Sequence, residues 1–406
     1  MARVLGAAAV VAIAMTGCSE DSDRAAASSR TVADSAGIEI VTLSLDPMPV
    51  CDLSGATFRI GSLEGEGGTG LTQVQDVAVL QNGRIGVLDY QEAAVLLFDE
   101  DGSPAGRIGG RGDGPGELDR VWFLDVLPDG RVLVGDYLPF EWHFYAPDGG
   151  HLRSVVMSPR IMGRPDFAFP LGSAPEFVVQ DVSGRQTDPT GRFTDETRHV
   201  VRYASTGEAT DSLGQLYFRR TGFTDLENRM VDDALFGARA SVFPVGDLVG
   251  YATGRDPEVR LLGPGGEPRR ILRWPDRDRE VRSDAVAAAR RDMRSQLEEF
   301  LPPDRVDSFL VEQFDARDVE ERFPAHGRVA SGEDGGIWIE RFIRPGSGDP
   351  PAWFVLEPSG SARCSIAIPP GLSPMYLSRT RLLGVEMDEL RVPYVVGYDV
   401  LPPSGG

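Results

Sequence analysis

A pattern of glycine, aspartate and apolar residues occurs twice in the first 150 residues, and equivalent positions are 47 residues apart (Gly65 and Gly112, for example). Each copy has a Gly-rich loop followed by short apolar runs that are separated by Asn-Gly or Asp-Gly turns. Such runs and turns predict antiparallel strands joined by tight hairpins. A four-stranded unit that recurs every 40–50 residues is typical of a β-propeller blade, so the repeat predicts an all-β propeller.

Weaker copies of the pattern follow at residues 176–213, 241–274 and 328–368, and a further copy occupies residues 374–401. With the two clear copies, they predict a six-bladed β-propeller. Seven blades is the alternative, because residues 161–229 form a long stretch for a single blade.

The two ends of the chain are predicted to share one blade. Residues 57–61 (TFRIG) match the fourth strand of the repeat, residues 106–109 (GRIG), but no first three strands precede them. Residues 374–401 supply about three strands and no fourth. We therefore expect residues 57–61 to complete the last blade, which would close the ring and remove its free sheet edges.

The charge and composition exclude several classes of function. The net charge of −21 argues against nucleic-acid binding, which needs a basic face. All 41 basic residues are arginine, so the chain cannot use a P-loop lysine, a Schiff-base lysine or a lysine general base.

The N-terminus has the features of an export signal. Arg3 precedes an apolar run at residues 4–15, which is too short to span a bilayer. The following Met15-Thr16-Gly17-Cys18 resembles the bacterial lipoprotein signal, in which the cysteine is lipidated after cleavage. An ordinary secretory signal with a chance cysteine is the alternative.

The predicted organisation is therefore a signal peptide at 1–17, a flexible tether at 18–36 and a propeller domain at 37–406. Ser19 follows Cys18 at the position where inner-membrane retention would need an aspartate. We therefore expect palmitate on Cys18 to anchor the protein in the outer membrane of the cell envelope.

Residues 278–320 interrupt the β pattern with helical spacing of apolar residues, beginning at a cap on Ser283 or Asp284. Pro302-Pro303 should end this helix, and a second short helix is expected over residues 304–314. The predicted helical insertion would serve as a lid or a partner surface, or would merely cover apolar surface.

One face of the ring is the predicted ligand face. Because blade strands alternate in direction, the loops that enter first strands share a face with those joining second to third strands. The candidate ligand residues on this face are Asp89, Tyr90, Arg111, Asp113, Glu117, Arg120, Asp136, Tyr137 and Glu141. The recurring Asp89 and Asp136 could hold a cation, although capping of loop N–H groups is the more ordinary role of such aspartates.

Catalytic motifs are not evident. The four histidines lack metal-ligand spacing, no GxSxG elbow occurs, and no Ser/His/Asp set can be assigned. The GxGxxG match at residues 65–70 precedes no helical pattern, so it is better explained as a blade-entry loop than as a dinucleotide site. We therefore predict no catalytic residues.

Cys51 and Cys364 remain if Cys18 is lipidated. One precedes the closing strand and the other lies near the start of the last blade, so both ends of the ring seam carry a cysteine. In an oxidising envelope they could form a disulfide.

The sequence GRGDGPGEL, followed by LPDGRVLVGD, resembles bacterial six-bladed β-propeller lipoproteins related to NHL-repeat proteins. The resemblance implies a secreted, lipid-anchored propeller, and it implies no settled activity. It leaves two hypotheses: a non-enzymatic scaffold that binds a protein, peptide or glycan, or a metal-dependent propeller hydrolase or lyase with a calcium or zinc ion in the central channel. The asparagines that such channel sites favour are scarce, Asn82 and Asn228 being the only two.

Overall fold

The structure is a computed structural model of the chain. It describes residues 30–403 except for 46, 64–69, 139, 160, 162–163, 173–175, 182–189, 226, 228–229 and 277. Cys18, the signal segment, the GxGxxG match and Asn228 therefore lie outside the described residues.

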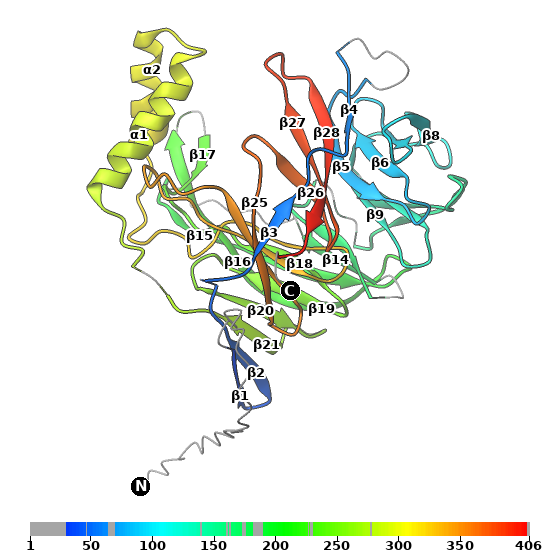
Figure 1. Cartoon of the computed structure of the whole chain (residues 1–406), viewed down its shortest axis with the longest axis horizontal. Coiled ribbons are helices and arrows are strands. Elements are labelled where there is room, and N and C mark those ends of the chain that lie inside the picture. Colours follow the sequence, from blue (N-terminus) through cyan, green and yellow to red (C-terminus); the bar gives the residue numbers. More distant parts are fainter. Residues whose placement is uncertain are drawn as a thin grey trace, which may run out of the picture.

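The chain folds into a β-propeller in which each blade is an antiparallel sheet (Figure 1). The first two blades are the strong copies of the repeat. The first contains β5 (Val74–Val79), β6 (Ile85–Asp89), β7 (Ala94–Phe98) and β8 (Pro104–Gly109). The second contains β9 (Val121–Val126), β10 (Val132–Asp136), β11 (Glu141–Tyr145) and β12 (His151–Val156).

The third blade accounts for the long stretch that suggested a seventh. Its strands are β13 (Ala168–Leu171), β14 (Glu176–Asp181), β15 (Thr194–Tyr203), β16 (Ala209–Asp225) and β17 (Met230–Asp233). Strands β15 and β16 have 10 and 17 residues, and β17 adds a fifth strand, so this region is one large blade.

The remaining three blades bring the count to six. The fourth contains β18 (Ser241–Val245), β19 (Leu248–Ala252), β20 (Glu258–Leu262) and β21 (Pro268–Arg273). The fifth contains β22 (Val329–Ser331), β23 (Ile337–Glu340), β24 (Ala352–Leu356) and β25 (Ala362–Ala367). The sixth contains β26 (Ser373–Leu377), β27 (Arg381–Met387) and β28 (Pro393–Leu401).

The sixth blade takes its fourth strand from the other end of the chain. Strand β4 (Phe58–Ile60) pairs antiparallel with β28, with Arg59 opposite Val396. The predicted closure of the ring by residues 57–61 is therefore confirmed.

The residues before β4 extend this closure over two further blades. Strand β2 (Ile38–Thr42) pairs parallel with β21 of the fourth blade. Strand β3 (Val50–Leu53) pairs parallel with β25 of the fifth blade and antiparallel with β28 of the sixth. Residues 38–60, which we call the N-terminal belt, thus run along the outer edges of three successive blades.

A short strand precedes the belt within the segment for which the sequence predicts a flexible tether. Strand β1 (Thr31–Ser35) pairs antiparallel with β2 through a turn at Ala36 and Gly37. Both turn residues have positive φ, 56° and 83°, as a two-residue hairpin of right-handed twist requires. The tether that the sequence predicts up to residue 36 is therefore structured from Thr31 onward.

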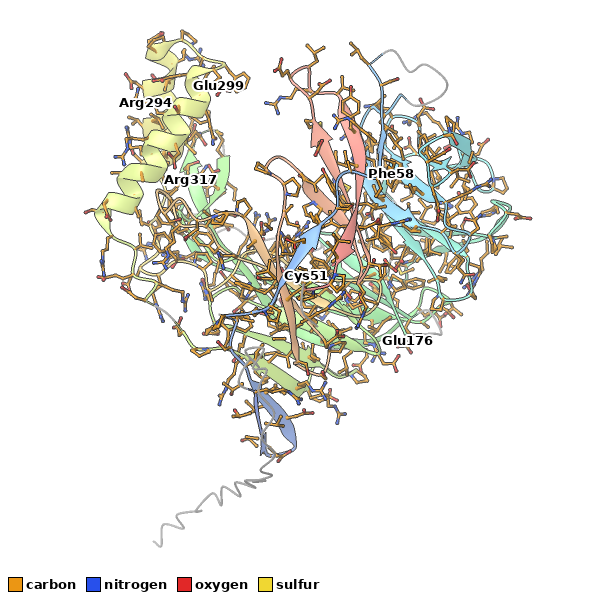
Figure 2. All side chains as sticks on the ribbon, in the orientation of Figure 1. Cys51, Phe58, Glu176, Arg294, Glu299 and Arg317 are labelled. Carbon is orange, nitrogen blue, oxygen red and sulfur yellow. A yellow bond between two sulfur atoms is a disulfide. The ribbon has the colours of Figure 1, made fainter. Side chains whose placement is uncertain are left out.

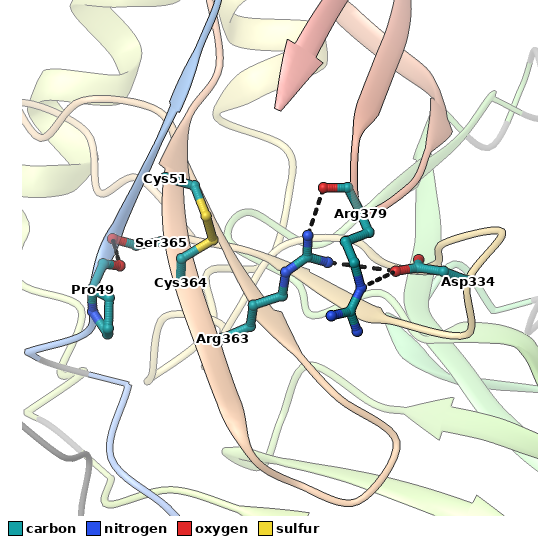
Figure 3. The surroundings of a disulfide bond; sticks show 7 residues. All are labelled: Pro49, Cys51, Asp334, Arg363, Cys364, Ser365 and Arg379. Carbon is teal, nitrogen blue, oxygen red and sulfur yellow. Dashed lines mark hydrogen bonds and ion pairs between the residues drawn. A yellow bond between two sulfur atoms is a disulfide. The ribbon is translucent and has the colours of Figure 1, made fainter. Parts of the chain in front are cut away.

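The belt is joined covalently to the fifth blade. Cys51 on β3 and Cys364 on β25 form a disulfide, with the two sulfurs 2.02 Å apart (Figure 3). Next to it, the N–H of Ser365 donates to the carbonyl of Pro49 at 2.8 Å. Both cysteines are buried, so the bond belongs to the core between the belt and the fifth and sixth blades.

The apolar core lies between neighbouring blades, and each pair of neighbours shares one cluster of buried side chains. Trp142 and Trp338 are completely buried in these clusters, and Trp122 and Trp353 are nearly so. Because both faces of each blade are covered, the strands have continuous apolar runs rather than strict alternation.

The helical insertion stands on the same side of the ring as the tips of β27 and β28 (Figure 1). It contains α1 (Ser283–Glu298), α2 (Pro303–Phe309) and a π-helical turn (Leu310–Phe314). The predicted cap is wrong: the N-cap is Arg282, and its side chain makes no capping hydrogen bond. Ser283 and Asp284 instead start the first turn, where an acidic side chain favours the helix dipole.

The insertion is fixed to the propeller at its base and along one face. Its two stems pair, with the N–H of Val281 donating to the carbonyl of Glu321 at 2.9 Å. Met293 and Leu297 of α1 pack on a cluster that includes Leu235, just after the third blade. Figure 2 shows that Arg294 of α1 and Glu299, which follows the end of α1, stand apart from Cys51 and Phe58 of the belt. Among the described residues, no helix is both long and apolar enough to cross a bilayer.

Candidate functional site

Asp89 is the most completely hydrogen-bonded residue of the predicted ligand face. Its carboxylate accepts the N–H and the hydroxyl of Thr72 at 2.7 and 2.5 Å, and also the N–H groups of Gln73, Gln91 and Glu92. Burial by itself raises the pKa of Asp89, but the hydrogen bonds from Thr72 and the loop outweigh it, so the pKa lies below 3.8. Asp89 therefore holds two loops together, with no oxygen left over for a cation.

Asp136 has the same capping role in the second blade, with fewer hydrogen bonds than Asp89. Its carboxylate accepts the N–H groups of Asp119 and Arg120 at 2.7 and 2.8 Å. Burial, the largest influence, leaves the pKa of Asp136 raised in spite of these hydrogen bonds. The two aspartates occupy equivalent positions of the repeat, and both cap the N–H groups of a neighbouring loop.

The other candidates of this face also contribute to its loops. Arg111 donates to Asp119 at 2.9 Å and to the carbonyls of Tyr90 and Gln91. Glu117 accepts the N–H of Gly114, Arg120 lies 3.8 Å from Asp119, and a hydrogen bond between the side chains of Tyr137 and Tyr90, in which Tyr137 donates, raises the pKa of Tyr137. Asp113 is exposed and Glu141 is half-buried. All nine lie on the first two blades, and their contact with a ligand stays a prediction.

Replacing Asp89 by alanine is expected to destabilise the propeller by about 3–4 kcal/mol, because five donors in part-buried hydrogen bonds lose their acceptor. Since the folded-state pKa is lowered, this stabilisation is present above pH 3.8 and is lost as the pH falls through the folded pKa. Urea unfolding at pH 7 and pH 3.5 measures both effects. Asp99→Ala is the control, because Asp99 makes an exposed ion pair with Arg84 that contributes about 1 kcal/mol or less. Equal losses for the two variants would contradict the capping role.

Three carboxylates that the sequence did not single out gather in the central channel. Asp76 and Asp125 lie on the innermost strands of the first two blades, and Glu333 lies in the first hairpin of the fifth blade. Desolvation, with a smaller contribution from Glu333, raises the pKa of Asp76 to about 7, although hydrogen bonds from the N–H groups of Leu124 and Val77 act to lower it. Desolvation, then Glu333 and Asp76, raise the pKa of Asp125 well above its ordinary value.

These carboxylates do not make a metal site. In the part of the chain that the structure describes, no three His, Cys, Asp or Glu side chains are placed to hold a metal ion together. Asp76 instead accepts the N–H of Leu124 on the neighbouring blade at 3.0 Å, which joins two innermost strands. The calcium or zinc ion of the enzyme hypothesis stays a prediction.

The channel carboxylates should make stability depend on pH with a definite sign. A folded-state pKa near 7 for Asp76 means that the folded chain binds protons more tightly than the unfolded chain, so stability falls as the pH rises from 4 through 7. Asp125→Asn removes one repelling charge and keeps an acceptor for the N–H of Val126. We expect this variant to be more stable than the parent by about 1 kcal/mol at pH 8 and equal to it near pH 4, as measured by urea unfolding. The exposed Asp113→Asn should leave the pH dependence unchanged; a parallel shift in both variants would contradict the repulsion.

Two cavities open on the ligand face on the opposite side of the ring from Asp89 and Asp136. The mouth cavity, about 490 Å³, lies where β13, β18 and β22 begin. Its charged lining residues are Asp166, Arg239 and Arg328. The interblade cavity, about 400 Å³, lies between the fourth and fifth blades under the stems of the insertion. Ser44 and Leu45 of the belt form part of its wall.

The two cavities share a wall made by Pro324, His326 and Phe342. The His326 ring is almost completely buried, and Nδ1 lies 2.8 Å from the carbonyl oxygen of Gly327. A carbonyl can only accept, so Nδ1 carries the proton and the neutral ring has an acceptor lone pair on Nε2. Nε2 is buried and has no partner among the described residues. Burial lowers the pKa of His326 to about 4, so the ring is neutral at pH 7.

The insertion is connected to the interblade cavity through Arg279. This buried guanidinium donates to Asp276 at 2.7 Å, to the carbonyl of Phe323 at 2.6 Å and to that of Arg255 at 3.0 Å. Arg322 also donates to Asp276 at 2.5 Å. These bonds fasten both stems of the insertion to the cavity wall, so a ligand in the cavity would lie beside the base of the insertion.

The structure also brings together a serine, a histidine and an aspartate that sequence reasoning could not assemble. Ser212 Oγ lies 2.8 Å from His199 Nε2, and His199 Nδ1 lies 3.7 Å from Asp181. The second distance is too long for a hydrogen bond, and Ser212 Oγ already accepts the N–H of Gly214 at 2.9 Å. The three residues lie on neighbouring strands of one blade, and we assign them a cross-strand structural role.

Comparisons with known proteins give distant likenesses only. No protein-family model matches the chain, and no curated protein matches it in sequence. A Bacteroides fragilis protein thought to be exported has a similar structure, with 11% identity and a TM-score of 0.47 over 89% of this chain and 99% of that one. Virginiamycin B lyase from Staphylococcus aureus has 10% identity and a TM-score of 0.39 over 81% and 95%. Regucalcin, a calcium-binding protein from Agrobacterium tumefaciens, has 11% identity and a TM-score of 0.39 over 87% and 97%. These likenesses are too distant to indicate what this chain binds.

Proposed function

We propose that the protein is a lipid-anchored propeller of the bacterial cell envelope that acts as a non-enzymatic binding scaffold. Its ligand face would take a protein, peptide or glycan at the interblade and mouth cavities. The observation that carries the proposal is the pair of adjoining cavities, about 400 and 490 Å³, which have the size of ordinary ligand sites. They meet at a buried histidine that has an unused acceptor.

The chemistry around the cavities supports binding rather than catalysis. Arg279 and Asp276 hold the stems of the insertion, and Glu340 accepts the backbone N–H of Arg328 at 2.9 Å. The neutral His326 has its Nδ1 proton bound to a carbonyl, and no serine or cysteine nucleophile stands within hydrogen-bond reach of its Nε2 in the described residues. These groups can position a ligand, but they do not form a nucleophile and base pair.

Capture from an envelope extract tests the binding role. The chain from residue 19 onward would be immobilised as the parent and as Ala325→Trp, which fills the interblade cavity from its wall. We expect the parent to retain a discrete ligand that the filled variant does not retain. Ala33→Trp on the exposed strand β1 is the matched control and should behave as the parent. Equal capture by all three chains would overturn the proposal.

The enzyme alternative has a direct test. Metal analysis of the same purified chain would reveal one tightly held calcium or zinc ion if the channel carries a catalytic metal. A stoichiometric ion that is lost on replacing Asp76 and Asp125 by alanine, or Asp89 and Asp136 by alanine, would overturn the scaffold proposal.

Lipid anchoring is supported by the sequence around Cys18. We expect the expressed full chain to incorporate radiolabelled palmitate and to fractionate with the outer membrane. Cys18→Ala should remove the label and release the chain from the membrane fraction. Retention of the label in Cys18→Ala would contradict lipidation at this residue.

A further inference from the structure

The interblade cavity has a chemically divided wall. One side is aromatic and includes Trp274, Phe323, Phe342 and Phe354, which lie on the fourth blade, the stem of the insertion and the fifth blade. The other side carries the polar groups of the cavity. An aromatic wall favours a flat apolar group, because aromatic pairs gain interaction energy beyond the buried area.

Arg341 is a polar group of the cavity with unused bonding capacity. Its guanidinium lies over the ring of Phe354 at 5.2 Å, and among the described residues it makes no ion pair. Arg279, in contrast, uses all three of its nitrogens in the same wall. A guanidinium that rests on an aromatic ring keeps its N–H groups at the edge, where they can bind a carboxylate in a two-pronged manner.

The acidic residues of the cavity do not cancel this charge. Asp276 is neutralised by Arg279 and Arg322, and Glu340 binds the backbone of Arg328. Asp349 is the remaining acid of the lining, which also contains Arg341 and Arg344, two arginines that make no ion pair among the described residues. The local balance therefore favours an anion, although the chain as a whole has a net charge of −21.

His326, in contrast to Arg341, requires a hydrogen-bond donor from the ligand. Its Nε2 is a buried acceptor without a partner in the described residues, so a ligand donor could satisfy it only by displacing part of the cavity wall. The ring lies 5.8 Å from that of Trp274, on the aromatic side of the cavity. A buried unpaired acceptor costs about 1–3 kcal/mol, and a ligand hydroxyl or N–H would recover part of it.

We propose that the interblade cavity binds an aromatic carboxylate that carries a hydroxyl or N–H donor, with the carboxylate at Arg341 and the donor at His326 Nε2. This inference rests on the proposed binding function of the ligand face and names its ligand chemistry. The same chemistry occurs in a free aromatic hydroxy acid and in the C-terminal tyrosine of a peptide.

Calorimetric titration with three small probes tests the chemistry. 4-Hydroxyphenylacetate has all three features, phenylacetate lacks the hydroxyl, and tyramine replaces the carboxylate by an ammonium. We expect the hydroxylated acid to bind about tenfold more tightly than phenylacetate, which corresponds to one hydrogen bond. Tyramine should not bind. Tighter binding of tyramine than of the acid, or no binding of either acid or of the peptide below, would overturn the proposal.

Two variants separate the roles of the residues. Arg341→Ala should weaken 4-hydroxyphenylacetate at least tenfold, with partial recovery in Arg341→Lys. His326→Phe keeps the aromatic volume and removes the acceptor, so the ratio between the two acids should fall to about one. His199→Phe is the matched control and should keep the parent ratio. Urea unfolding midpoints would show that each variant is folded, and an unchanged ratio in folded His326→Phe would contradict the role of His326.

A peptide arm identifies the source of the ligand and separates this inference from the proposed function. Gly-Gly-Tyr with a free C-terminus should bind, and its C-terminal amide should bind at least tenfold more weakly. The tighter of the peptide and the free acid indicates the natural source. If none of the probes binds while Ala325→Trp still abolishes capture from the envelope extract, the chemistry named here is wrong and the binding function stands. If none of the probes binds and Ala325→Trp also leaves the capture from the extract unchanged, both the ligand chemistry and the binding function are wrong.

Discussion

Deletion of residues 37–61 is expected to unfold the propeller completely. The deletion removes β2, β3 and β4 and leaves the edges of β21, β25 and β28 without partners. It also removes the buried side chains of Val41, Leu43, Phe58 and Ile60. At about 1.5–3 kcal/mol for each buried side chain, their loss alone amounts to roughly 6–12 kcal/mol. This is comparable with the entire stability of a typical domain, about 5–15 kcal/mol.

Thermal unfolding followed by circular dichroism and calorimetry measures this effect. The parent should melt in one cooperative transition, and the truncated chain should show none. Deletion of residues 30–36 is the control, because strand β1 is exposed along its whole length and covers only the outer edge of β2. A chain without residues 37–61 that melts cooperatively near the parent temperature would show that the belt does not close the ring.

Removal of the disulfide is the second large expected effect. The bond between Cys51 and Cys364 spans 313 residues of sequence, and the chain-entropy model assigns about 5–6 kcal/mol to a loop of this size. Measured values often fall below the model, so we expect the double variant Cys51→Ala and Cys364→Ala to lose about 3–5 kcal/mol. The reason is that the unfolded parent chain remains tied end to end, whereas the unfolded variant gains the full freedom of an open chain.

Urea unfolding with and without reductant measures the contribution of the bond. Reductant should lower the midpoint of the parent toward that of the double variant and should leave the double variant unchanged. Intact mass under native and reducing conditions provides an independent reading, since the bonded form is lighter by two hydrogens. Two free thiols in the native parent, or an equal effect of reductant on both chains, would contradict a structural disulfide.

The repeat explains why so much of the architecture could be predicted. Blade strands pair with their neighbours in sequence, so each hairpin has a local signal in its apolar runs and its Asp-Gly or Asn-Gly turn. The same locality made the closing strand recognisable, because residues 57–61 resemble a fourth strand that lacks its own blade. Capping by Asp89 is also local, since its partners lie within 17 residues of it.

The belt could be predicted only in part, because its pairings join segments that are far apart in the sequence. The parallel pairing of β2 with β21 joins Glu39 to Arg270, 231 residues apart, and no turn or periodicity connects the two segments. Strand β1 was missed because residues 31–35 are small, polar and exposed, and only the neighbouring edge of β2 gives them hydrogen-bond partners. Such strands pair only after the blade has formed and presents a free edge, and the composition of either strand does not predict the pairing.

The candidate site shows the same division between local and long-range information. Sequence reasoning predicted a ligand face and nine candidate residues on the first two blades, but the cavities lie over the third, fourth and fifth blades. Arg341 lies in a weak copy of the repeat and His326 just before it, where an isolated histidine or arginine gives no signal. Their importance depends on burial and on missing partners, which exist only in the folded chain.

The sequence by itself determined that this chain is a propeller, how its ring closes and which face carries the long loops, because those properties depend on short-range hairpin chemistry repeated along the chain. Only the tertiary structure decided where a ligand could sit. The interblade cavity takes its wall from the belt, the fourth blade, the stems of the insertion and the fifth blade, which span residues 44 to 354. Contacts between segments so far apart depend on how whole blades pack, and no local pattern of residues encodes them.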